Sequence, residues 1–282
     1  MTEYRQVIDS HTHILPNEFR EDRERWLKVD RTFGALFASP KAKSASAEDL
    51  VAEMDASGVN AAVAAGYGWT SIDAARLAND YALESATRHE GRIIPFCSVN
   101  PLWGQDAVKE IERCAASGVR GLGELHPDTQ GFLHSDFATL APMLDCARSL
   151  GLPVLIHASE PVGHSYTGKG TVTPDLLEAL VTAFPANTFI FAHFGGGLPF
   201  YGLMPEVRRL LEHCYFDSAA WPFLYEPRVF ELATRSMGAE KITFGSDYPL
   251  VPMSRALAGI EGLDATIADQ IAVGNAAALL KA

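Results

Sequence analysis

Short apolar runs alternate with helix-like patterns along most of this chain, and this alternation restricts the possible folds more than any other feature. The runs are typical of buried strands, and repeated strand and helix units build a parallel sheet. Eight runs in 282 residues predict one α/β domain over residues 1–282, a (β/α)8 TIM barrel, which commonly needs about 250 residues. The expected strands are Val7–His11, Ala61–Ala65, Ile93–Val99, Val119–Glu124, Pro153–His157, Thr188–His193, Tyr215–Ser218 and Ile242–Asp247.

Several of the expected helices carry recognisable end signals. Ser46 followed by Asp49 resembles a capping box, in which each side chain accepts a backbone hydrogen bond from the other residue. Gly58 then supplies the left-handed residue that commonly ends a helix. Thr173 followed by Pro174 is a cap residue with proline at the first helical position. The apolar stripes between these signals are expected to be core packing.

Two stretches do not fit the repeated pattern. Residues 15–45 form a long insertion after the first strand, and residues 159–172 form a glycine-containing segment after the fifth. The insertion lies at the end of the barrel where active sites are found, so it is either a lid or a solvated excursion. The second segment is either a mobile substrate loop or an irregular connection.

Composition excludes several classes of protein. With 48% hydrophobic and 21% charged residues, the chain resembles a soluble globular protein, and no run approaches the roughly 18 apolar residues of a spanning helix. A net charge of −12 argues against nucleic acid or an anionic membrane as a partner. No signal-like segment begins the sequence, so a cytoplasmic location is expected. The cysteines lack the spacing of a disulfide framework or a cysteine zinc site, and they are Cys97, Cys114, Cys146 and Cys214.

Several strand ends carry residues that bind metals. His11 and His13 are two apart, so on a strand both side chains point the same way. His157, His193 and Asp247 each close a later apolar run. A lone histidine of this kind is usually a core residue, but a set of ionisable groups at the ends of buried runs is costly unless it is paired or metal-bound.

The spacing of these residues supports the same interpretation. Each unit of such a barrel has about 30 residues, so Glu124, His157, His193 and Asp247 fall at the ends of the fourth, fifth, sixth and eighth strands. All strand ends of a closed barrel meet at one opening, which predicts a metal site there. His126 lies two residues beyond Glu124 and is close enough in sequence to reach the same opening.

Together these motifs resemble the amidohydrolase superfamily over essentially the whole chain. The matching residues are Asp9-x-His11-x-His13, the histidines after strands five and six, Gly245-Ser246-Asp247, and the closing Gly274-Asn275 segment. The most similar branch is the amidohydrolase-2 group, which includes aminocarboxymuconate-semialdehyde decarboxylase, resorcylate decarboxylases and pyrone-dicarboxylate lactonase. The motifs are specific for the superfamily and weak for the substrate.

The resemblance implies a divalent metal, with zinc as the expected ion, bound by His11, His13, His157 and Asp247. It implies that His193 either binds a second ion or orients the reacting group. Glu124 stands where some superfamily members use a bridging glutamate, although a strand-end residue hydrogen-bonded to a loop would look the same. Asp9 is expected to support the ligands rather than to bind metal.

Three functions follow as hypotheses. The first is a metal-dependent hydrolase of a small cyclic ester, amide or related carbonyl compound, in which a metal-bound hydroxide attacks, Asp247 carries the proton, and His193 or the metal polarises the carbonyl. Glu124 favours this hypothesis, because decarboxylases of the branch generally lack that glutamate. The alternative is a metal-dependent non-oxidative decarboxylase of an aromatic or unsaturated carboxylic acid. The third is a barrel that binds metal or a metabolite without turnover.

The expected partner is a small molecule with a carboxylate or a similar anion. An arginine fork suits such a group, although surface salt bridges would explain the same residues. A homodimer is suggested only by analogy with similar proteins. The candidate anion-binding residues are Arg20, Arg23, Arg25, Arg31 and Lys169.

Overall fold

The structure is a computed structural model that describes residues 6–281. Within these residues, eight parallel strands lie in sequence order around a barrel. They are β1 (Ile8–His13), β2 (Ala61–Ala65), β3 (Ile93–Cys97), β4 (Gly121–Leu125), β5 (Val154–Ile156), β6 (Phe189–Phe191), β7 (Cys214–Asp217) and β8 (Ile242–Thr243). The segment after β8 closes the barrel, because the backbone of Ser10 donates to Phe244 O and Thr12 pairs with Tyr248. The predicted (β/α)8 barrel is confirmed.

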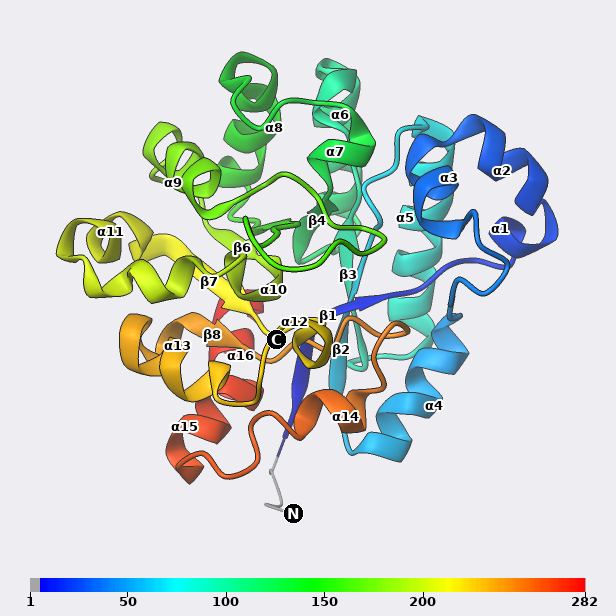
Figure 1. The fold of residues 1–282 in the computed structure, drawn as a ribbon. Coiled ribbons are helices and arrows are strands. Elements are labelled where there is room, and N and C mark those ends of the chain that lie inside the picture. Colours follow the sequence, from blue (N-terminus) through cyan, green and yellow to red (C-terminus); the bar gives the residue numbers. More distant parts are fainter. Residues whose placement is uncertain (1–5, 282) are drawn as a thin grey trace.

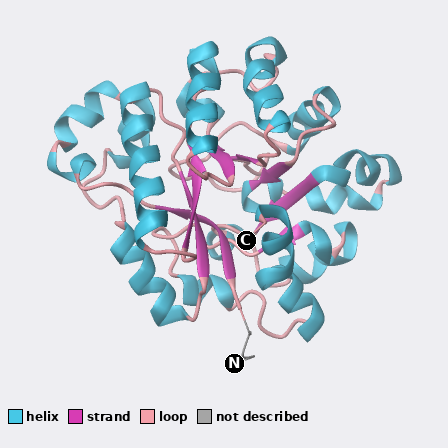
Figure 2. Cartoon of the chain, turned by 180° about the vertical axis from the view of Figure 1, so that it is seen from behind, coloured by secondary structure: helices cyan, strands magenta, loops and turns pink. Residues whose placement is uncertain are grey.

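Helices surround the strands on the outside (Figures 1 and 2). The longer α-helices are α4 (Ala47–Ser57), α5 (Ile72–Arg88), α6 (Gln105–Ala116), α8 (Phe137–Ser149), α9 (Pro174–Ala183) and α13 (Val229–Met237). The shorter ones are α1 (Glu18–Glu21), α2 (Arg23–Val29), α3 (Arg31–Phe37), α7 (Pro127–Gln130), α10 (Ala192–Gly195), α11 (Pro205–Leu210), α12 (Trp221–Leu224), α14 (Met253–Leu257), α15 (Ala265–Asp269) and α16 (Asn275–Leu280). Short 3-10 turns span Pro101–Trp103, Leu198–Leu203, Leu211–His213 and Ala239–Lys241, and a π-helical turn spans Gln270–Gly274.

The predicted end signals of α4 are confirmed. The side chains of Ser46 and Asp49 each accept a hydrogen bond from the backbone of the other, and Gly58 follows the helix with φ +72°. Pro174 likewise begins α9. These local signals therefore fix where the chain leaves each strand and enters the next helix.

The strands form because their side chains are buried on both faces, as parallel barrels require. Inside the barrel, Gly121 leaves room for the ring of Phe96, because a Cβ atom at this position would overlap that ring. Most predicted strands differ from the observed ones at their ends, by up to four residues. Strand β6 ends before His193 and β8 ends before Asp247, since these two residues adopt φ +58° and φ +67° and turn the chain out of the pleated conformation.

The insertion after β1 is a small helical lobe rather than a solvated excursion (Figure 1). Helices α1, α2 and α3 enclose a stacked aromatic cluster made by Phe19, Trp26, Phe33 and Phe37 with Trp69 of the barrel. Asp30 attaches the lobe to the loop after β2, because its carboxylate accepts from the backbone of Phe33, Thr70 and Ser71. The lobe is thus fixed beside the opening of the barrel.

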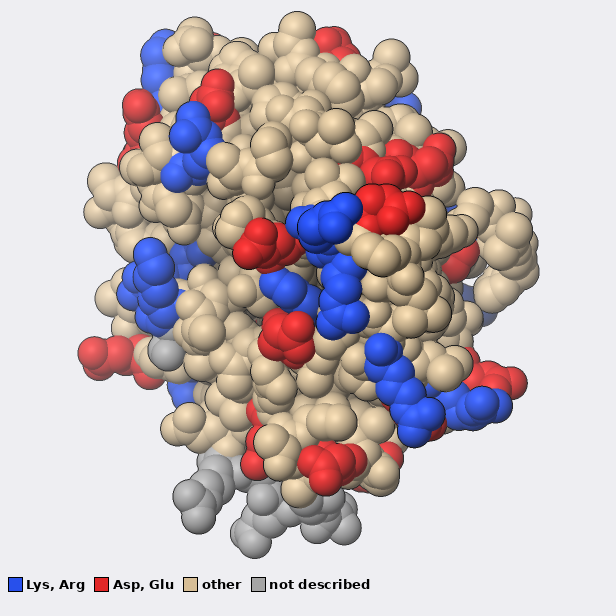
Figure 3. Space-filling view, turned by 90° about the vertical axis from the view of Figure 1, so that its left-hand side faces the viewer, with Lys and Arg blue, Asp and Glu red and all other residues tan. Residues whose placement is uncertain are grey.

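The surface carries charged side chains of both signs, and the cysteines form no disulfide framework. On the face shown in Figure 3, positive and negative side chains are interspersed with uncharged ones. The four cysteines are free thiols, and three of them are buried. Among residues 6–281, no helix combines the length and the apolar character needed to cross a bilayer.

Candidate metal centre

The six predicted ligand residues meet at the carboxyl ends of the strands. Strand β1 contributes two of them, and the other four come from β4 and from the residues that follow β5, β6 and β8. They form two groups of possible ligands, each with its donor atoms within 4.8 Å of one another. The groups are His11, His13 and Asp247, and Glu124, His157 and His193.

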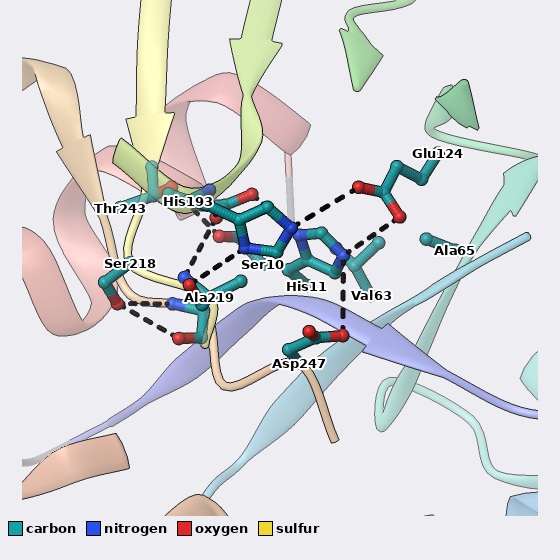
Figure 4. A network of polar contacts seen from close by, with 12 residues as sticks. Ser10, His11, Val63, Ala65, Glu124, His193, Ser218, Ala219, Thr243 and Asp247 are labelled. Atoms are coloured by element: carbon teal, nitrogen blue, oxygen red, sulfur yellow. Dashed lines mark hydrogen bonds and ion pairs between the residues drawn. The ribbon is translucent and has the colours of Figure 1, made fainter. Parts of the chain in front are cut away.

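In the first group, two imidazoles of one strand converge on a carboxylate. The Nε2 atoms of His11 and His13 are 3.1 Å apart. Asp247 Oδ1 lies 3.4 Å from His13 Nε2 and 4.0 Å from His11 Nε2. Figure 4 shows His11 on its strand and Asp247 on the loop after β8, with their side chains pointing toward each other. The two-residue spacing of the histidines predicts this convergence of their side chains.

Glu124 joins the first group to the second. Its Oε1 lies 3.0 Å from His157 Nδ1 and 3.8 Å from His193 Nε2, while its Oε2 lies 3.6 Å from His11 Nε2 and 3.7 Å from His13 Nε2. His193 Nε2 is 3.3 Å from His157 Nδ1. The carboxylate of Glu124 is therefore shared by four imidazoles, and it does not pack at the rim.

Hydrogen bonds on the outer side orient three of the rings. His11 Nδ1 lies 2.8 Å from Asp217 Oδ2, and His13 Nδ1 lies 3.1 Å from the carbonyl oxygen of Ala65. His193 Nδ1 lies 3.0 Å from the carbonyl oxygen of Ala219. With Nδ1–H donating outward, Nε2 faces the centre in all three rings and is the nitrogen that binds a metal once it carries no proton.

The charges of the centre are strongly coupled. Burial alone raises the pKa of Glu124, but His11 and His157 outweigh it and hold the pKa well below its usual range. Burial likewise raises the pKa of Asp247, but His13 and His11 outweigh it and lower the pKa. Burial lowers the pKa of His11, whereas Asp217 and Glu124 raise it more, so its pKa lies well above the usual value. Both carboxylates are thus ionised, and anionic oxygens beside imidazoles fit a divalent cation.

The backbone around the ligands is held by buried aspartates. Asp217 Oδ1 accepts from the backbone of His193 at 3.0 Å and supports its left-handed conformation. Asp9 Oδ1 accepts from the backbone of His11 and of Ser246, which links β1 to the loop that carries Asp247. Burial raises the pKa of Asp9 to about 7, more than these hydrogen bonds lower it. Asp9 thus supports two ligand segments and is in neither ligand group.

A cavity of about 560 Å³ opens above the ligands. Its floor includes His13, Glu124, His157, His193 and Asp247. The insertion contributes Leu36, Phe37, Ser39, Lys41, Ala42 and Lys43, and the loop after β5 contributes His164, Tyr166, Thr167 and Gly168. Its remaining walls are Tyr67, His126, Ala220, Phe223, Leu224, Pro249 and Leu250. Both irregular stretches of the sequence therefore form walls of one cavity, which has the volume of a small-molecule site.

The predicted anion-binding residues are wrong, since none of the five lines this cavity. Arg20 donates to Ser44, Arg23 to the carbonyl oxygens of Phe37 and Ala38, and Arg31 to that of Asp128. Arg25 lies over Trp26 beside Asp22, and Lys169 donates to the carbonyl oxygens of Val162 and His164. The contacts of Arg23, Arg25 and Lys169 thus stay within their own segments, whereas Arg31 joins the insertion to α7.

Four residues of the centre and cavity were not given these roles by the sequence analysis. Asp217 ends an apolar run in the same way as Asp247, and this signal could have identified it. Tyr67 stacks on His13 with ring centroids 4.2 Å apart. Lys41 and Lys43 lie in a segment without periodicity, so only the folded structure shows them at the cavity.

His126 reaches the cavity, as its position suggested. Its ring stacks on that of His157 with centroids 4.1 Å apart, and its Nε2 lies 3.3 Å from the carbonyl oxygen of Gly168. Burial and the neighbouring His157 lower the pKa of His126 to about 4. The His126 ring is therefore neutral at ordinary pH, and it packs against the ring of His157 in the cavity wall.

Comparison with known proteins places this geometry in a family. The amidohydrolase family model matches residues 8–282, which is almost the whole chain. The chain belongs to the amidohydrolase family. A curated relative in Dictyostelium discoideum, 2-amino-3-carboxymuconate-6-semialdehyde decarboxylase, is 23% identical over 95% of this chain and 90% of its own length. The gamma-resorcylate decarboxylase of Polaromonas sp. (strain JS666) is 24% identical over 74% of this chain and 76% of its own length.

A solved structure of a similar protein has the same fold as this chain. The 5-carboxyvanillate decarboxylase of Novosphingobium aromaticivorans, complexed with manganese and a nitrobenzoic acid, superposes with a TM-score of 0.81 at 17% identity. The match covers 98% of this chain and 96% of that one. At this identity the likeness establishes the barrel alone.

The prediction of hydrolysis is contradicted by these comparisons, since the relatives are named decarboxylases. The prediction depended on one residue, Glu124, as a mark of hydrolysis. In the structure, Glu124 is a buried carboxylate among four imidazoles. A carboxylate in such surroundings suits a cation in either reaction, so its presence does not distinguish hydrolysis from decarboxylation.

Proposed function

We propose that this amidohydrolase is a metal-dependent, non-oxidative decarboxylase of a small aromatic or unsaturated carboxylic acid. The observation that carries the proposal is the likeness of the chain, over 95% and 74% of its length, to two curated proteins that are both named decarboxylases. The cavity with convergent imidazoles and carboxylates supplies the chemistry that such a reaction needs. The activity of the relatives is taken here as support for the same class of reaction.

The donor set fits a divalent metal. His11, His13 and Asp247 would hold an ion, with Glu124 and His157 completing its surroundings and His193 adjacent to both. Imidazole nitrogen with carboxylate oxygen suits zinc or manganese, and zinc remains the ion expected from the sequence. A bound divalent cation supplies positive charge that binds substrate oxygens and stabilises negative charge as the carbon–carbon bond breaks.

A residue of the ligand set transfers the proton that the reaction needs. In a decarboxylation without oxidation, the bond to the carboxylate breaks, its electron pair stays on the substrate carbon, and carbon dioxide leaves. That carbon then takes one proton. Asp247 lines the cavity, its side chain is 15% exposed and its carboxylate is ionised, so it would first take a proton from water in the cavity and then pass it to the substrate carbon. We assign the proton transfer to Asp247.

His193 and the apolar walls position the reacting group. His193 Nδ1 is hydrogen-bonded to Ala219, so its Nε2 faces the cavity beside Glu124 and His157. Phe37, Phe223 and Leu250 form apolar walls above it. A carboxylate loses solvation among such walls, whereas neutral carbon dioxide does not, and this difference favours loss of carbon dioxide.

Carbon dioxide release by metal-loaded protein tests the proposal. Hydroxybenzoates and unsaturated dicarboxylic acids would be supplied, with carbon dioxide and residual acid measured together. We expect release that equals the loss of one acid, stops when a chelator removes the metal, and falls by at least about 100-fold in Asp247→Asn. Loss of an acid without carbon dioxide, or no release from any acid supplied, would show that the proposal is wrong.

A further inference from the structure

Two lysines line the cavity and are not neutralised by carboxylates. Lys41 and Lys43 follow α3 and belong to the wall that the insertion contributes. The ion pairs of the insertion instead join Arg20 with Asp49 and Arg25 with Asp22. Among residues 6–281, neither lysine forms an ion pair. The cavity therefore has two uncompensated positive charges on one wall, in a chain whose net charge is −12.

Lys43 is held at a defined place on this wall. Its Nζ donates to the carbonyl oxygen of Leu250 at 2.9 Å, and Leu250 lies in the loop that also carries Asp247. An ammonium group has three N–H donors, so two remain for a ligand. Lys41 forms no side-chain hydrogen bond within the described part of the chain and lines the same wall. Both amines therefore retain N–H donors that a ligand in the cavity can use.

The negative and the positive side chains that line the cavity belong to different parts of the chain. The carboxylates, Glu124 and Asp247, are both among the candidate metal ligands. The lysines belong to the insertion, and apolar side chains, including Phe37, Phe223 and Leu250, occupy much of the remaining wall. A volume of about 560 Å³ accommodates a ligand with polar groups at both ends.

We propose that Lys41 and Lys43 bind a second carboxylate, so that the substrate is a dicarboxylic acid. One carboxylate lies at the metal ligands and is lost, and the other is held by the two amines. The identity of the lost group rests on the proposed decarboxylase function, whereas binding of the second group does not. In a strongly acidic protein, this positive wall also attracts a dianion to the opening.

Binding of two matched acids to the metal-loaded protein tests the inference. Isophthalate and benzoate share a ring and one carboxylate and differ in the second carboxylate. Calorimetry would compare the wild type, Lys41→Ala/Lys43→Ala, and Lys28→Ala as a control, because Lys28 lies in the same insertion but does not line the cavity. Two partly screened ion pairs are expected to give isophthalate about a tenfold advantage in the wild type, equivalent to about 1.4 kcal/mol.

The double variant should lose this advantage while its affinity for benzoate stays within about twofold, and Lys28→Ala should behave as the wild type. High salt should reduce the advantage in the wild type. Equal affinity for the two acids in the wild type, no measurable binding of isophthalate, or an unchanged advantage in the double variant would overturn the inference. If the advantage is present and depends on the lysines but no acid releases carbon dioxide, the proposed reaction is wrong and the dicarboxylate site stands.

Discussion

At the scale of the residue, the central feature is one carboxylate shared by two groups of ligands. Glu124 is 6% exposed and lies within 3.8 Å of four imidazole nitrogens. Its negative charge compensates whatever positive charge the centre holds. Removing that charge while keeping the shape should therefore disturb the metal rather than the fold.

Glu124→Gln is expected to lower metal affinity and turnover together by about 100-fold, the upper part of the range for a disturbed ligand environment. The metal content of dialysed protein and the rate of carbon dioxide release would be measured on the same samples. Glu112→Gln, on the outer surface of α6, is a matched control. Full metal content with full activity would show that Glu124 is not a ligand.

Asp247→Asn should lower turnover by at least about 100-fold and leave the barrel folded. Asparagine tolerates the left-handed conformation that Asp247 adopts at φ +67°, so the backbone of the loop is retained. The amide cannot carry the proton, and a loss of about 100-fold to 10,000-fold is typical for a missing acid or base. Steady-state kinetics and thermal unfolding would be compared with those of His11→Ala, which should lose metal. Activity near that of the wild type would remove Asp247 from the proposed role.

At the scale of the element, strands and helices could be predicted from periodicity, and the segments that shape the cavity could not. All eight strands lie where the apolar runs predicted them, and the end signals of α4 are confirmed. The predicted ligands were recognisable because they close such runs. The lobe formed by residues 15–45 has no repeating pattern that shows which of its cations face the cavity. The arginines there donate to loops, and two lysines line the wall.

The attachment of this lobe depends on Asp30. Asp30→Ala would leave the backbone N–H groups of Phe33, Thr70 and Ser71 without their acceptor. A cost of about 1–3 kcal/mol is expected, and local opening of the lobe should follow. Limited proteolysis and hydrogen exchange over residues 15–45 would detect it. Asp22→Ala, at an exposed site in the same lobe, should change little. Equal protection in both variants would show that the lobe is held by its aromatic cluster alone.

At the scale of the whole molecule, the centre connects segments that are far apart in the sequence. Its candidate ligands come from β1, β4 and the segments that follow β5, β6 and β8, and the first and last along the chain are His11 and Asp247. A ligand that binds only the folded state adds about 2.7 kcal/mol to stability when its concentration is 100 times its Kd. The barrel should therefore depend on metal for part of its stability.

Removal of metal by a chelator should lower the Tm by several degrees, and added zinc or manganese should restore it. Calorimetric scans of the chelated and reloaded protein would measure the difference. In His11→Ala the Tm should no longer respond to metal, because a ligand is missing. A wild-type Tm that is the same with and without metal would show that the ligands bind no ion.

Because the pKa of His11 is raised, a metal ion that binds at the centre must displace a proton from this ring. Without an ion, Asp217 and Glu124 hold a proton on His11, and the pKa of His157 is also raised by Glu124 despite burial. Nε2 must lose that proton before it can bind metal, so loading should acidify a weakly buffered solution. Metal affinity should rise as the pH increases toward the pKa of His11 and fall in acid. Titration with a pH indicator at several pH values would show whether protons leave as the ion enters, and affinity independent of pH would exclude this exchange.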